Sequence, residues 1–307
     1  MERRISIHVP GDWIGGPGLL PFYRRLAGGL DARGVPYRFV PIERAGLPDR
    51  VAGDTDYHIV NHGRVRHPRV LNAGVAYIYP YWHLDPSGIR SFASIGTLGF
   101  DPGAVDGPAA QAFFRQMVKR QVRARRSRYE QPEAVEPLPR GCIAVFLQSE
   151  GHRGVGETLW LDRWQMLRAC LNAAGERAVV VKPHPLDRDP ELFEGLAALQ
   201  AADPRLVVSF ANIHDILAAA DRVVTINSAV GIEALLHRRP VILCGQADFH
   251  HICDEARTEA ALDACLAAPP RPRPFARYVY WYFAGQCLNA GAPDLADRVL
   301  DRVRATG

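Results

Sequence analysis

Residues 179–185 read Val-Val-Val-Lys-Pro-His-Pro, and residues 223–236 read Val-Val-Thr-Ile-Asn-Ser-Ala-Val-Gly-Ile-Glu-Ala-Leu-Leu. Each stretch begins as an apolar, β-branched run, which is typical of a buried strand in a parallel sheet, and then ends abruptly in polar residues. The second stretch continues from its polar turn into an apolar helical pattern. Strand, turn and helix in this order indicate an open α/β sheet, in which ligands bind beyond the carboxyl ends of the strands.

The polar residues that follow these two strands have the chemistry of a phosphate-binding site. Asn227 and Ser228 lie at the turn, and Gly231 lies in the first turn of the predicted helix, where backbone N–H groups and the helix dipole favour an anion. Lys182 and His184 add cationic donors, and the prolines beside them hold the backbone extended. We therefore predict that these five residues bind the phosphate of a nucleotide.

Glu233 follows on the same predicted helix. A carboxylate at this place can accept two hydroxyl groups of a ribose, as an acidic residue does in dinucleotide-binding folds. Structural alternatives stay open at this point: Glu233 could instead stabilise the helix dipole, and Asn227 or Ser228 could be the helix N-cap. His184 could likewise end a strand and cap a helix without touching a ligand.

The rest of the chain also alternates strands and helices, and 307 residues suit two domains of about 150 residues each. In the first half, strands are predicted at 5–9, 37–42, 57–61 and 76–79, with a helix at 19–33. In the second half, strands are predicted at 143–148, 178–181, 206–209, 222–226 and 240–244, and helices at 161–174, 190–202, 213–220 and 231–237. A last helix is predicted at 295–304.

This rhythm predicts an α/β fold with two Rossmann-like domains that face each other across a cleft. Three prolines and no apolar periodicity mark residues 129–141 as a linker. The predicted domains are residues 1–128 and 142–270, and residues 271–307 form a helical segment that packs back on the first domain.

Composition excludes several classes of protein. With 48% hydrophobic and 23% charged residues, the chain is expected to be globular, and its net charge of +4 gives no overall signature of polyanion binding. The six cysteines form no Cys-x-x-Cys pair, and no apolar run has the length of a membrane span. Since no signal peptide is visible either, we expect a cytoplasmic protein with reduced thiols.

One segment, Arg115 to Arg128, is densely basic and is predicted to be helical. The simplest interpretation is a solvated helix face near a domain junction. The alternative is peripheral contact with an anionic glycan or with the anionic membrane surface. Nucleic acid is not an expected partner, because no known nucleic-acid-binding module surrounds this segment.

The motifs Lys-Pro-His-Pro at 182–185, Thr-Ile-Asn-Ser-Ala-Val-Gly-Ile-Glu-Ala-Leu at 225–235 and Arg-Arg-Pro-Val-Ile-Leu-Cys-Gly at 238–245 resemble those of bacterial capsule polysaccharide biosynthesis proteins. That family includes transferases that use CMP-Kdo, and its His-Pro and serine motifs are similar to those of bacterial sialyltransferases. The resemblance covers roughly residues 141–260. It implies that His184 and Ser228, with Asn227 beside them, hold the phosphate of CMP.

The resemblance also implies a catalytic carboxylate after the first strand of the donor domain. Here that strand leads into Gln148-Ser-Glu-Gly-His152, so Gln148 is expected beside the nucleotide. Glu150 is the candidate nucleophile or general base. The family more often has an aspartate slightly later, and His152 is the rival base. A polar loop without a catalytic role is the structural alternative.

In the first half, an aromatic patch is the candidate acceptor site. Tyrosine and tryptophan faces suit pyranose rings, and a neighbouring His/Asp pair could orient or deprotonate an acceptor hydroxyl. A core strand that leads into a turn is the alternative. The candidate acceptor-binding residues are Tyr81, Trp82, His83, Asp85 and, at another strand end, His62.

Neither a metal nor a cofactor is expected. Asp54-Thr-Asp56 and Asp187-Arg-Asp189 have the carboxylate-x-carboxylate form that metal-using transferases exploit, but such tripeptides arise often by chance. A nucleoside monophosphate carries less charge than a diphosphate, so Lys182, His184 and a helix N-terminus could neutralise it without Mg²⁺.

Together these features predict a GT-B-type glycosyltransferase of capsule or surface-polysaccharide biosynthesis. It would transfer an acidic, Kdo-like sugar from a CMP-linked donor, bound by the second domain, to a glycan or lipid-linked glycan at the first domain. Three alternatives stay open: a UDP-sugar transferase, a sugar-nucleotide 2-epimerase, and a non-catalytic protein of capsule export or glycan binding.

Overall fold

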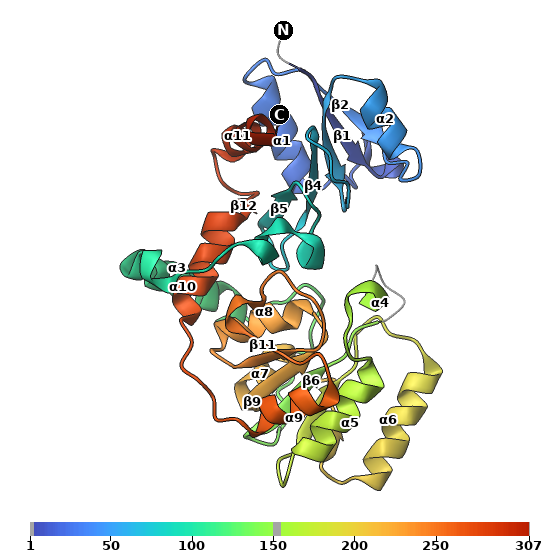
Figure 1. The fold of residues 1–307 in the computed structure, drawn as a ribbon, viewed down its shortest axis with the longest axis vertical. Helices are drawn as coiled ribbons and strands as arrows, with labels where there is room; N and C mark the ends of the chain where they lie inside the picture. Colours follow the sequence, from blue (N-terminus) through green and yellow to red (C-terminus); the bar gives the residue numbers. More distant parts are fainter. Residues whose placement is uncertain (1–2, 150–154, 307) are drawn as a thin grey trace. The chain divides into compact units, whose positions relative to one another are not determined.

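The computed structural model describes residues 3–149 and 155–306 (Figure 1). The chain forms two compact units, one of residues 1–98 with 282–307 and the other of residues 99–281. Each unit contains a six-stranded sheet, parallel throughout in the second unit and mostly parallel in the first. The predicted α/β class with two Rossmann-like units is confirmed.

The first unit has the strand order β12-β5-β4-β3-β1-β2. β1, β2, β3 and β4 are parallel, whereas β5 and β12 run antiparallel to their neighbours. Its strands are β1 (Ile5–Val9), β2 (Tyr37–Pro41), β3 (Tyr57–Asn61), β4 (Val70–Val75), β5 (Tyr81–Asp85) and β12 (Leu288–Asn289). Helices α1 (Pro21–Asp31) and α11 (Leu295–Thr306) share one hydrophobic core with the sheet, and α2 (Leu47–Gly53) packs on a separate cluster.

The predicted strand at residues 76–79 is wrong. This segment is the turn between the antiparallel strands β4 and β5. Tyr77 has a left-handed backbone with φ of 62°, and the N–H of Ile78 bonds back to the carbonyl of Ala76 at 2.7 Å. Because Ala76, Tyr77 and Ile78 are all buried, the sequence shows an apolar run although the backbone turns.

The second unit has the strand order β11-β10-β9-β6-β7-β8. The chain builds β6, β7 and β8 outward in one direction and then returns to the other side of β6 to form β9. The topological switch point therefore lies between β6 and β9. The strands are β6 (Cys142–Phe146), β7 (Val179–Lys182), β8 (Leu206–Val208), β9 (Ala220–Thr225), β10 (Val241–Leu243) and β11 (Asp254–Glu255).

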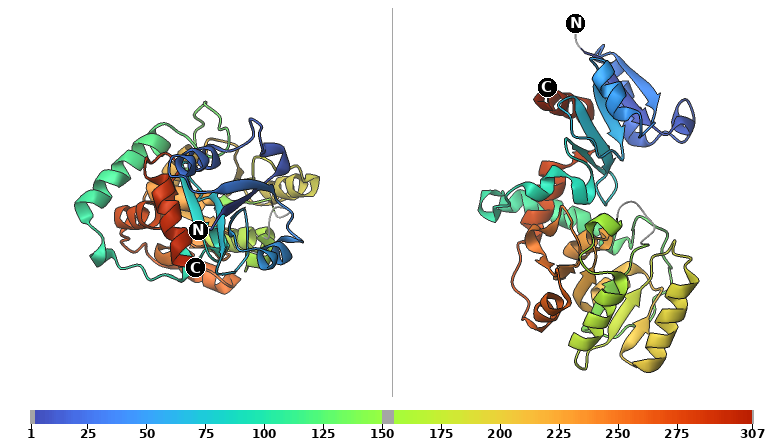
Figure 2. Two further views of the ribbon diagram at one scale, coloured as in Figure 1. Left: turned by 90° about the horizontal axis from the view of Figure 1, so that it is seen from above. Right: turned by 45° about the vertical axis from the view of Figure 1, so that its right-hand side comes forward.

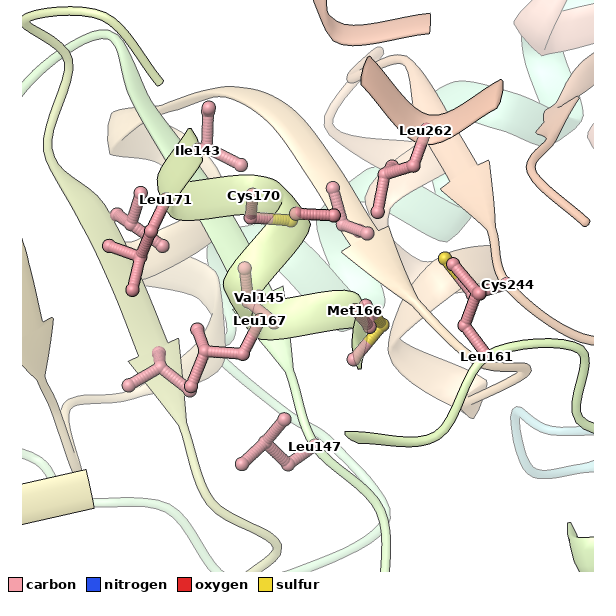
Figure 3. Packing of buried hydrophobic residues seen from close by; sticks show 14 of the residues in the cluster. Ile143, Val145, Leu147, Leu161, Met166, Leu167, Cys170, Leu171, Cys244 and Leu262 are labelled. Carbon is pink, nitrogen blue, oxygen red and sulfur yellow. The ribbon is translucent and has the colours of Figure 1, made fainter. Parts of the chain in front are cut away.

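Helices cover both faces of this second sheet, which explains why its strands read as continuous apolar runs (Figure 2). On one face α5 (Arg163–Ala173), α6 (Pro190–Ala202) and α9 (Glu259–Ala267) bury leucines against alternate strand residues. Figure 3 shows Leu167 and Leu171 of α5 and Leu262 of α9 in this core. On the other face lie α7 (Ile213–Ala219) and α8 (Ala229–Leu236). A fully buried leucine stabilises the fold by about 1.5–3 kcal/mol, so this core holds the strand ends firmly in place.

The bounds of the two units differ from the predicted domain boundaries. Residues 99–128 and 271–281 lie in the second unit, because α3 (Gly107–Val118) packs on α10 (Phe275–Tyr280) and on α8. Residues 282–307 lie in the first unit, where α11 packs on α1. That packing is close: a Cβ on Gly29 would stand 2.5 Å from the Cβ of Ala296.

The basic segment is helical over part of its predicted length. α3 continues into a π-helical stretch, Lys119–Arg123, and residues 124–128 are not helical. Among the helices that the structure describes, none is both long and apolar enough to cross a membrane. The predicted contact with an anionic surface stays a prediction.

Candidate functional site

The carboxyl ends of β6 and β9 are joined at the switch point of the second sheet. Gln148, two residues beyond β6, donates from Nε2 to Oδ1 of Asn227 at 2.9 Å. Its Oε1 accepts the backbone N–H of Asn227 at 2.8 Å. Below this pair, the Thr225 hydroxyl donates to the carbonyl of Phe146 at 2.9 Å. Residues predicted from two separate motifs are thus in direct contact.

The side-chain amide nitrogen of Asn227 makes two further hydrogen bonds. Its Nδ2 donates to Oγ1 of Thr158 at 2.8 Å and to the carbonyl of Gln246 at 3.0 Å. The asparagine side chain is buried, so these bonds are shielded from water. Asn227 therefore fixes the turn that precedes α8, and Thr158 and Gln246 are site residues that the sequence did not indicate.

Ser228 is the N-cap of α8. Its Oγ accepts the N–H of Val230 at 3.3 Å, and its carbonyl accepts the N–H of Gly231 at 2.9 Å. The structural alternative for this serine is thus observed, yet a hydroxyl that accepts from the helix still carries a proton that it can donate. Gly231 is buried under Phe249, whose ring atoms would stand 3.0 Å from a Cβ at this position.

His184 lies two residues beyond β7 and is half-buried. Its Nδ1 accepts the N–H of Leu186 at 3.2 Å, which places the proton of the neutral imidazole on Nε2. The ring of Tyr129 meets the imidazole edge to face, with centroids 5.1 Å apart. His184 is therefore oriented from two sides and can donate a hydrogen bond from Nε2.

Lys182 is buried at the end of β7, where its ammonium group binds backbone. Nζ donates to the carbonyls of Phe210 at 3.0 Å and Ala211 at 2.7 Å. Burial lowers the pKa of Lys182. Lys182 thus holds the loop after β8 in place. Two of the three N–H groups of the ammonium are used in this way, so the predicted contact of Lys182 with a phosphate would have to use the third.

Glu233 is only 3% exposed. Its Oε1 accepts a hydrogen bond from the hydroxyl of Ser127 at 3.1 Å, and its Oε2 has no hydrogen-bond partner within the described residues. Burial raises the pKa of Glu233 to about 8, although the Ser127 hydrogen bond lowers it. The side chain is thus a neutral acid at pH 7.

The predicted catalytic residues Glu150 and His152 lie outside the described residues. The described chain reaches Ser149 beyond β6 and resumes at residue 155. Since Gln148 is anchored to Asn227, the start of this loop is fixed beside the N-terminus of α8. The catalytic roles of Glu150 and His152 stay predictions.

The predicted acceptor residues lie in the first unit, and most of them are buried. Trp82 is completely buried and stacks on Phe22, with ring centroids 4.4 Å apart. Tyr81 is buried against Phe283, and His83 contacts the hydroxyl of Tyr282 at 2.9 Å. These contacts give the three aromatic residues clear packing roles.

Asp85 and His62 also have structural contacts. The Asp85 carboxylate accepts hydrogen bonds from three backbone N–H groups and from the hydroxyl of Ser94, and so organises the loop that follows β5. His62 is half-buried just beyond β3, with φ of 49°. Tyr79, in the turn before β5, is 52% exposed.

The two carboxylate pairs engage arginines. Asp54 and Asp56 form ion pairs with Arg38, while Asp189 pairs with Arg163 at 2.6 Å. Among residues 3–149 and 155–306, no group of three or more His, Cys, Asp or Glu side chains could hold a metal ion.

Comparison with known proteins finds one family model that matches part of the second unit. Residues 162–255 match the family model described as capsule polysaccharide biosynthesis protein. The match includes the segments that carry Lys182, His184, Asn227, Ser228 and Glu233. Over 80 residues the chain is 36% identical to the capsule polysaccharide export protein KpsS of Escherichia coli. This aligned stretch covers 24% of this chain and 21% of that protein. The predicted resemblance to capsule polysaccharide biosynthesis proteins is confirmed.

Two solved structures of KpsC from Thermosulfurimonas dismutans share the fold. The β-Kdo 2,7 transferase aligns over 100% of both chains with a TM-score of 0.59 at 14% identity. The β-Kdo 2,4 transferase aligns over 91% of this chain and 89% of that chain, with a TM-score of 0.53 at 17% identity. The chain therefore has the GT-B-like fold of these two structures.

Proposed function

We propose that this chain, whose residues 162–255 match the capsule polysaccharide biosynthesis family, is a glycosyltransferase of capsule or surface-polysaccharide assembly. The observation that carries the proposal is the junction of Gln148 and Asn227 at the topological switch point. It places a fixed turn and the N-terminus of α8 where open α/β sheets bind ligands. The fold shared with two KpsC Kdo transferases agrees with this assignment.

The donor in this proposal is a CMP-linked acidic sugar, Kdo-like in character. Ser228 and the N-terminus of α8 would bind the single phosphate, and His184 would donate to it from Nε2. One imidazole and one helix N-terminus suit the charge of a monophosphate, for which no metal is needed. Gln148, Lys182 and Asn227 would hold the surrounding loops in place.

The chemical step in this proposal uses the loop after β6. Glu150 would act as nucleophile or as general base toward the acceptor hydroxyl, with His152 as the alternative base. His184 would protonate or hydrogen-bond the departing phosphate, which stabilises the negative charge that develops as the glycosidic bond breaks.

The acceptor is proposed to be a glycan or lipid-linked glycan that contacts the first unit. Tyr79 and His62 are the better placed candidates there, because both are more exposed than the buried Trp82. Arg115 and Lys119 to Arg123 would bring the protein, which we expect in the cytoplasm, to an anionic membrane surface.

A transfer assay with a CMP-linked Kdo donor tests the activity. We expect Glu150→Ala and His184→Ala each to lower the rate at least a hundredfold while the protein stays folded. Unchanged transfer in both variants would refute the catalytic assignment. An active enzyme that prefers UDP-sugars would instead support the alternative GT-B chemistry, a UDP-sugar transferase or a 2-epimerase.

A non-catalytic role in capsule export is the second candidate. One observation favours it: the Escherichia coli relative is named an export protein. The matched stretch spans about a fifth of that protein's length, so its activity and partners are no more than proposals for this chain. Glycan binding without nucleotide binding would support this candidate.

A further inference from the structure

The first sheet has a topological switch point of its own, between β1 and β3. β2 pairs in parallel with one edge of β1 and β3 with the other, so the chain builds the sheet in opposite directions from β1. In open α/β sheets, ligands bind beyond the carboxyl ends of the strands at such a point. The segments that follow β1, β2 and β3 there are residues 10–20, 42–46 and 62–66, all within the first unit.

The segment that follows β3 is held rigidly. Asn72 of β4 is completely buried, accepts the N–H of Val65 at 3.0 Å and donates to the carbonyl of Val65 at 2.9 Å. A Cβ on Gly63 would stand 2.2 Å from Oδ1 of Asn72, so this position requires glycine. His62, the first residue after β3, has a left-handed backbone with φ of 49°. Such strained backbone persists where neighbouring contacts enforce it, and it clusters at binding sites.

An arginine that follows β2 reaches the same strand end. Arg44 donates from Nη1 to the carbonyl of His62 at 3.0 Å and from Nη2 to the carbonyl of Asn61 at 3.4 Å. A guanidinium group has five N–H donors, so these two bonds orient the group and leave donors for a ligand. Arg44 is exposed and forms no ion pair with an acidic side chain of residues 3–149 and 155–306.

A second guanidinium group is oriented by an aromatic ring. The Cζ atom of Arg64 lies 3.7 Å from the ring centroid of Phe92, which belongs to the short helix Arg90–Phe92 after β5. Phe92 is itself closely packed, because a Cβ on Gly88 would stand 2.7 Å from the Cβ of Phe92. A stacked guanidinium group presents its N–H groups at its edge, where they match the two oxygens of a carboxylate or a phosphate.

Positive charge prevails in these three segments. Their cationic side chains are Arg44, Arg64 and Arg66, and their acidic side chains are Asp12 and Glu43. Glu43 pairs with Arg50 of α2 at 3.4 Å, which reduces its effect on the edge. An anionic ligand is therefore attracted to this end of the first sheet, whereas a neutral ligand gains nothing from the charge.

We propose that the switch point of the first sheet is the acceptor site and that it recognises an acidic glycan through an oxyanion, a carboxylate or a phosphate, bound by Arg44, Arg64 and His62. This inference rests on the proposed function, because it names the class of acceptor for the same transferase. It also moves the acceptor away from β5, where Trp82 and His83 are completely buried, to side chains that are exposed or half-buried.

The test measures the binding of three matched sugars to the full chain by ligand-observed NMR, with excess CMP present to occupy the nucleotide site. Methyl β-D-glucoside is neutral, methyl β-D-glucuronide carries a carboxylate, and methyl β-D-glucoside 6-phosphate carries a phosphate. At least one charged sugar should bind about tenfold more tightly than the neutral one, and the better of the two identifies the oxyanion. Equal affinity for all three sugars would overturn the inference.

Variants locate the preference for the charged sugar. Arg44→Gln and Arg64→Gln should each reduce it about fivefold or more, and CMP affinity should not change, because the proposed nucleotide site lies in the second unit. Arg3→Gln is the matched control: Arg3 also stacks on an aromatic ring, 5.7 Å from the centroid of Tyr57, but at the amino end of the sheet. An equal reduction in all three variants would indicate diffuse attraction by charge and contradict the site.

A conservative variant separates recognition from folding. Arg64→Lys keeps the positive charge but lacks the planar fork, so it should retain part of the preference that Arg64→Gln loses. If Arg64→Lys and Arg64→Gln both keep the full preference, Arg64 does not bind the oxyanion and the inference is wrong.

Failure of the inference is distinguishable from failure of the proposed function. CMP binding without any preference among the three sugars would refute the acidic-acceptor site and leave the nucleotide site in place. Absence of CMP binding would contradict the proposed function, and the acceptor role with it.

Discussion

Gln148 and Asn227, 79 residues apart in sequence, are joined by two hydrogen bonds of 2.9 and 2.8 Å at the carboxyl ends of β6 and β9. The amide of Asn227 also donates to Thr158 and Gln246. A single buried side chain thus connects the four segments that surround the N-terminus of α8. A buried hydrogen-bond network in which every polar group is paired holds a site rigid. The network stops stabilising the site when one of its groups is left without a partner.

Asn227→Asp should therefore weaken both fold and site. A carboxylate cannot donate, so the carbonyl of Gln246 loses its partner at 3.0 Å and faces a negative charge. We expect a loss of about 1–3 kcal/mol in unfolding free energy, and at least tenfold weaker CMP binding. Asn172→Asp, at an exposed position of α5, is the matched control. Equal stability and affinity in both variants would contradict the structural role of Asn227.

His184→Ala should lower affinity for the phosphate specifically. We expect at least tenfold weaker binding of CMP and little change for cytidine, which lacks the phosphate. His67→Ala is a close control, because His67 also precedes a proline and its Nδ1 also accepts a backbone N–H two residues later, at 3.1 Å. A similar loss for CMP and cytidine would show that His184 does not contact the phosphate.

Glu233 should make the ligand-free protein less stable as pH rises. Its pKa is about 8 in the folded protein and near the ordinary 4.5 when unfolded. Between these values the unfolded state binds fewer protons, so unfolding free energy falls by on the order of 1 kcal/mol per pH unit. Glu233→Gln should remove this decline, so the stability of the variant relative to wild type should increase from pH 5 to pH 8. Denaturant titrations of both proteins at pH 5 and at pH 8 measure the two unfolding free energies.

Trp82 and Tyr79 should behave differently, since one ring is buried and the other is exposed. Trp82→Ala removes the stack on Phe22 and should cost about 3–5 kcal/mol of stability. Tyr79→Ala should leave stability within about 0.5 kcal/mol and raise KM for the acceptor. An unchanged KM would remove Tyr79 from the acceptor site.

The exposed cations of α3 and the π-helical stretch should bind anionic vesicles. They have no ion pair among the described residues, and each cation near an anionic surface contributes about 1 kcal/mol. Neutralising all four should lower partitioning onto phosphatidylglycerol vesicles by more than a hundredfold, whereas four scattered control substitutions should have little effect. The test set is Arg115→Gln, Lys119→Gln, Arg120→Gln and Arg123→Gln, and the control set is Arg24→Gln, Arg66→Gln, Arg168→Gln and Arg304→Gln.

Local patterns were sufficient to predict five of the six strands of the second sheet, and the two-residue edge strand β11 was not predicted. The central strands are buried on both faces, so each reads as a short β-branched run such as Val179 to Val181. Ser228 was recognisable as a helix start for the same reason, because N-cap chemistry depends on adjacent residues. In the first unit, Tyr77 shows the limit of such patterns: a buried residue in a turn looks like a residue in a strand.

Contacts between distant segments could not be predicted in this way. Ser127 and Glu233 are 106 residues apart, and nothing in the basic run around Ser127 marks it as a partner for a buried acid. The carbonyls that bind Lys182 belong to a loop whose backbone carries no sequence signal. The bounds of the two units also differ from the predicted domain boundaries, because the packing of α3 on α10 joins segments that are far apart in the chain.

Calorimetry of the full chain with CMP, CDP and UDP tests the central proposal most directly. The site has one oriented histidine and one helix N-terminus for a phosphate, so we predict that CMP binds at least tenfold more tightly than UDP, without added metal. Tighter binding of UDP, or no binding of any of the three nucleotides, would contradict the proposal of a CMP-sugar transferase.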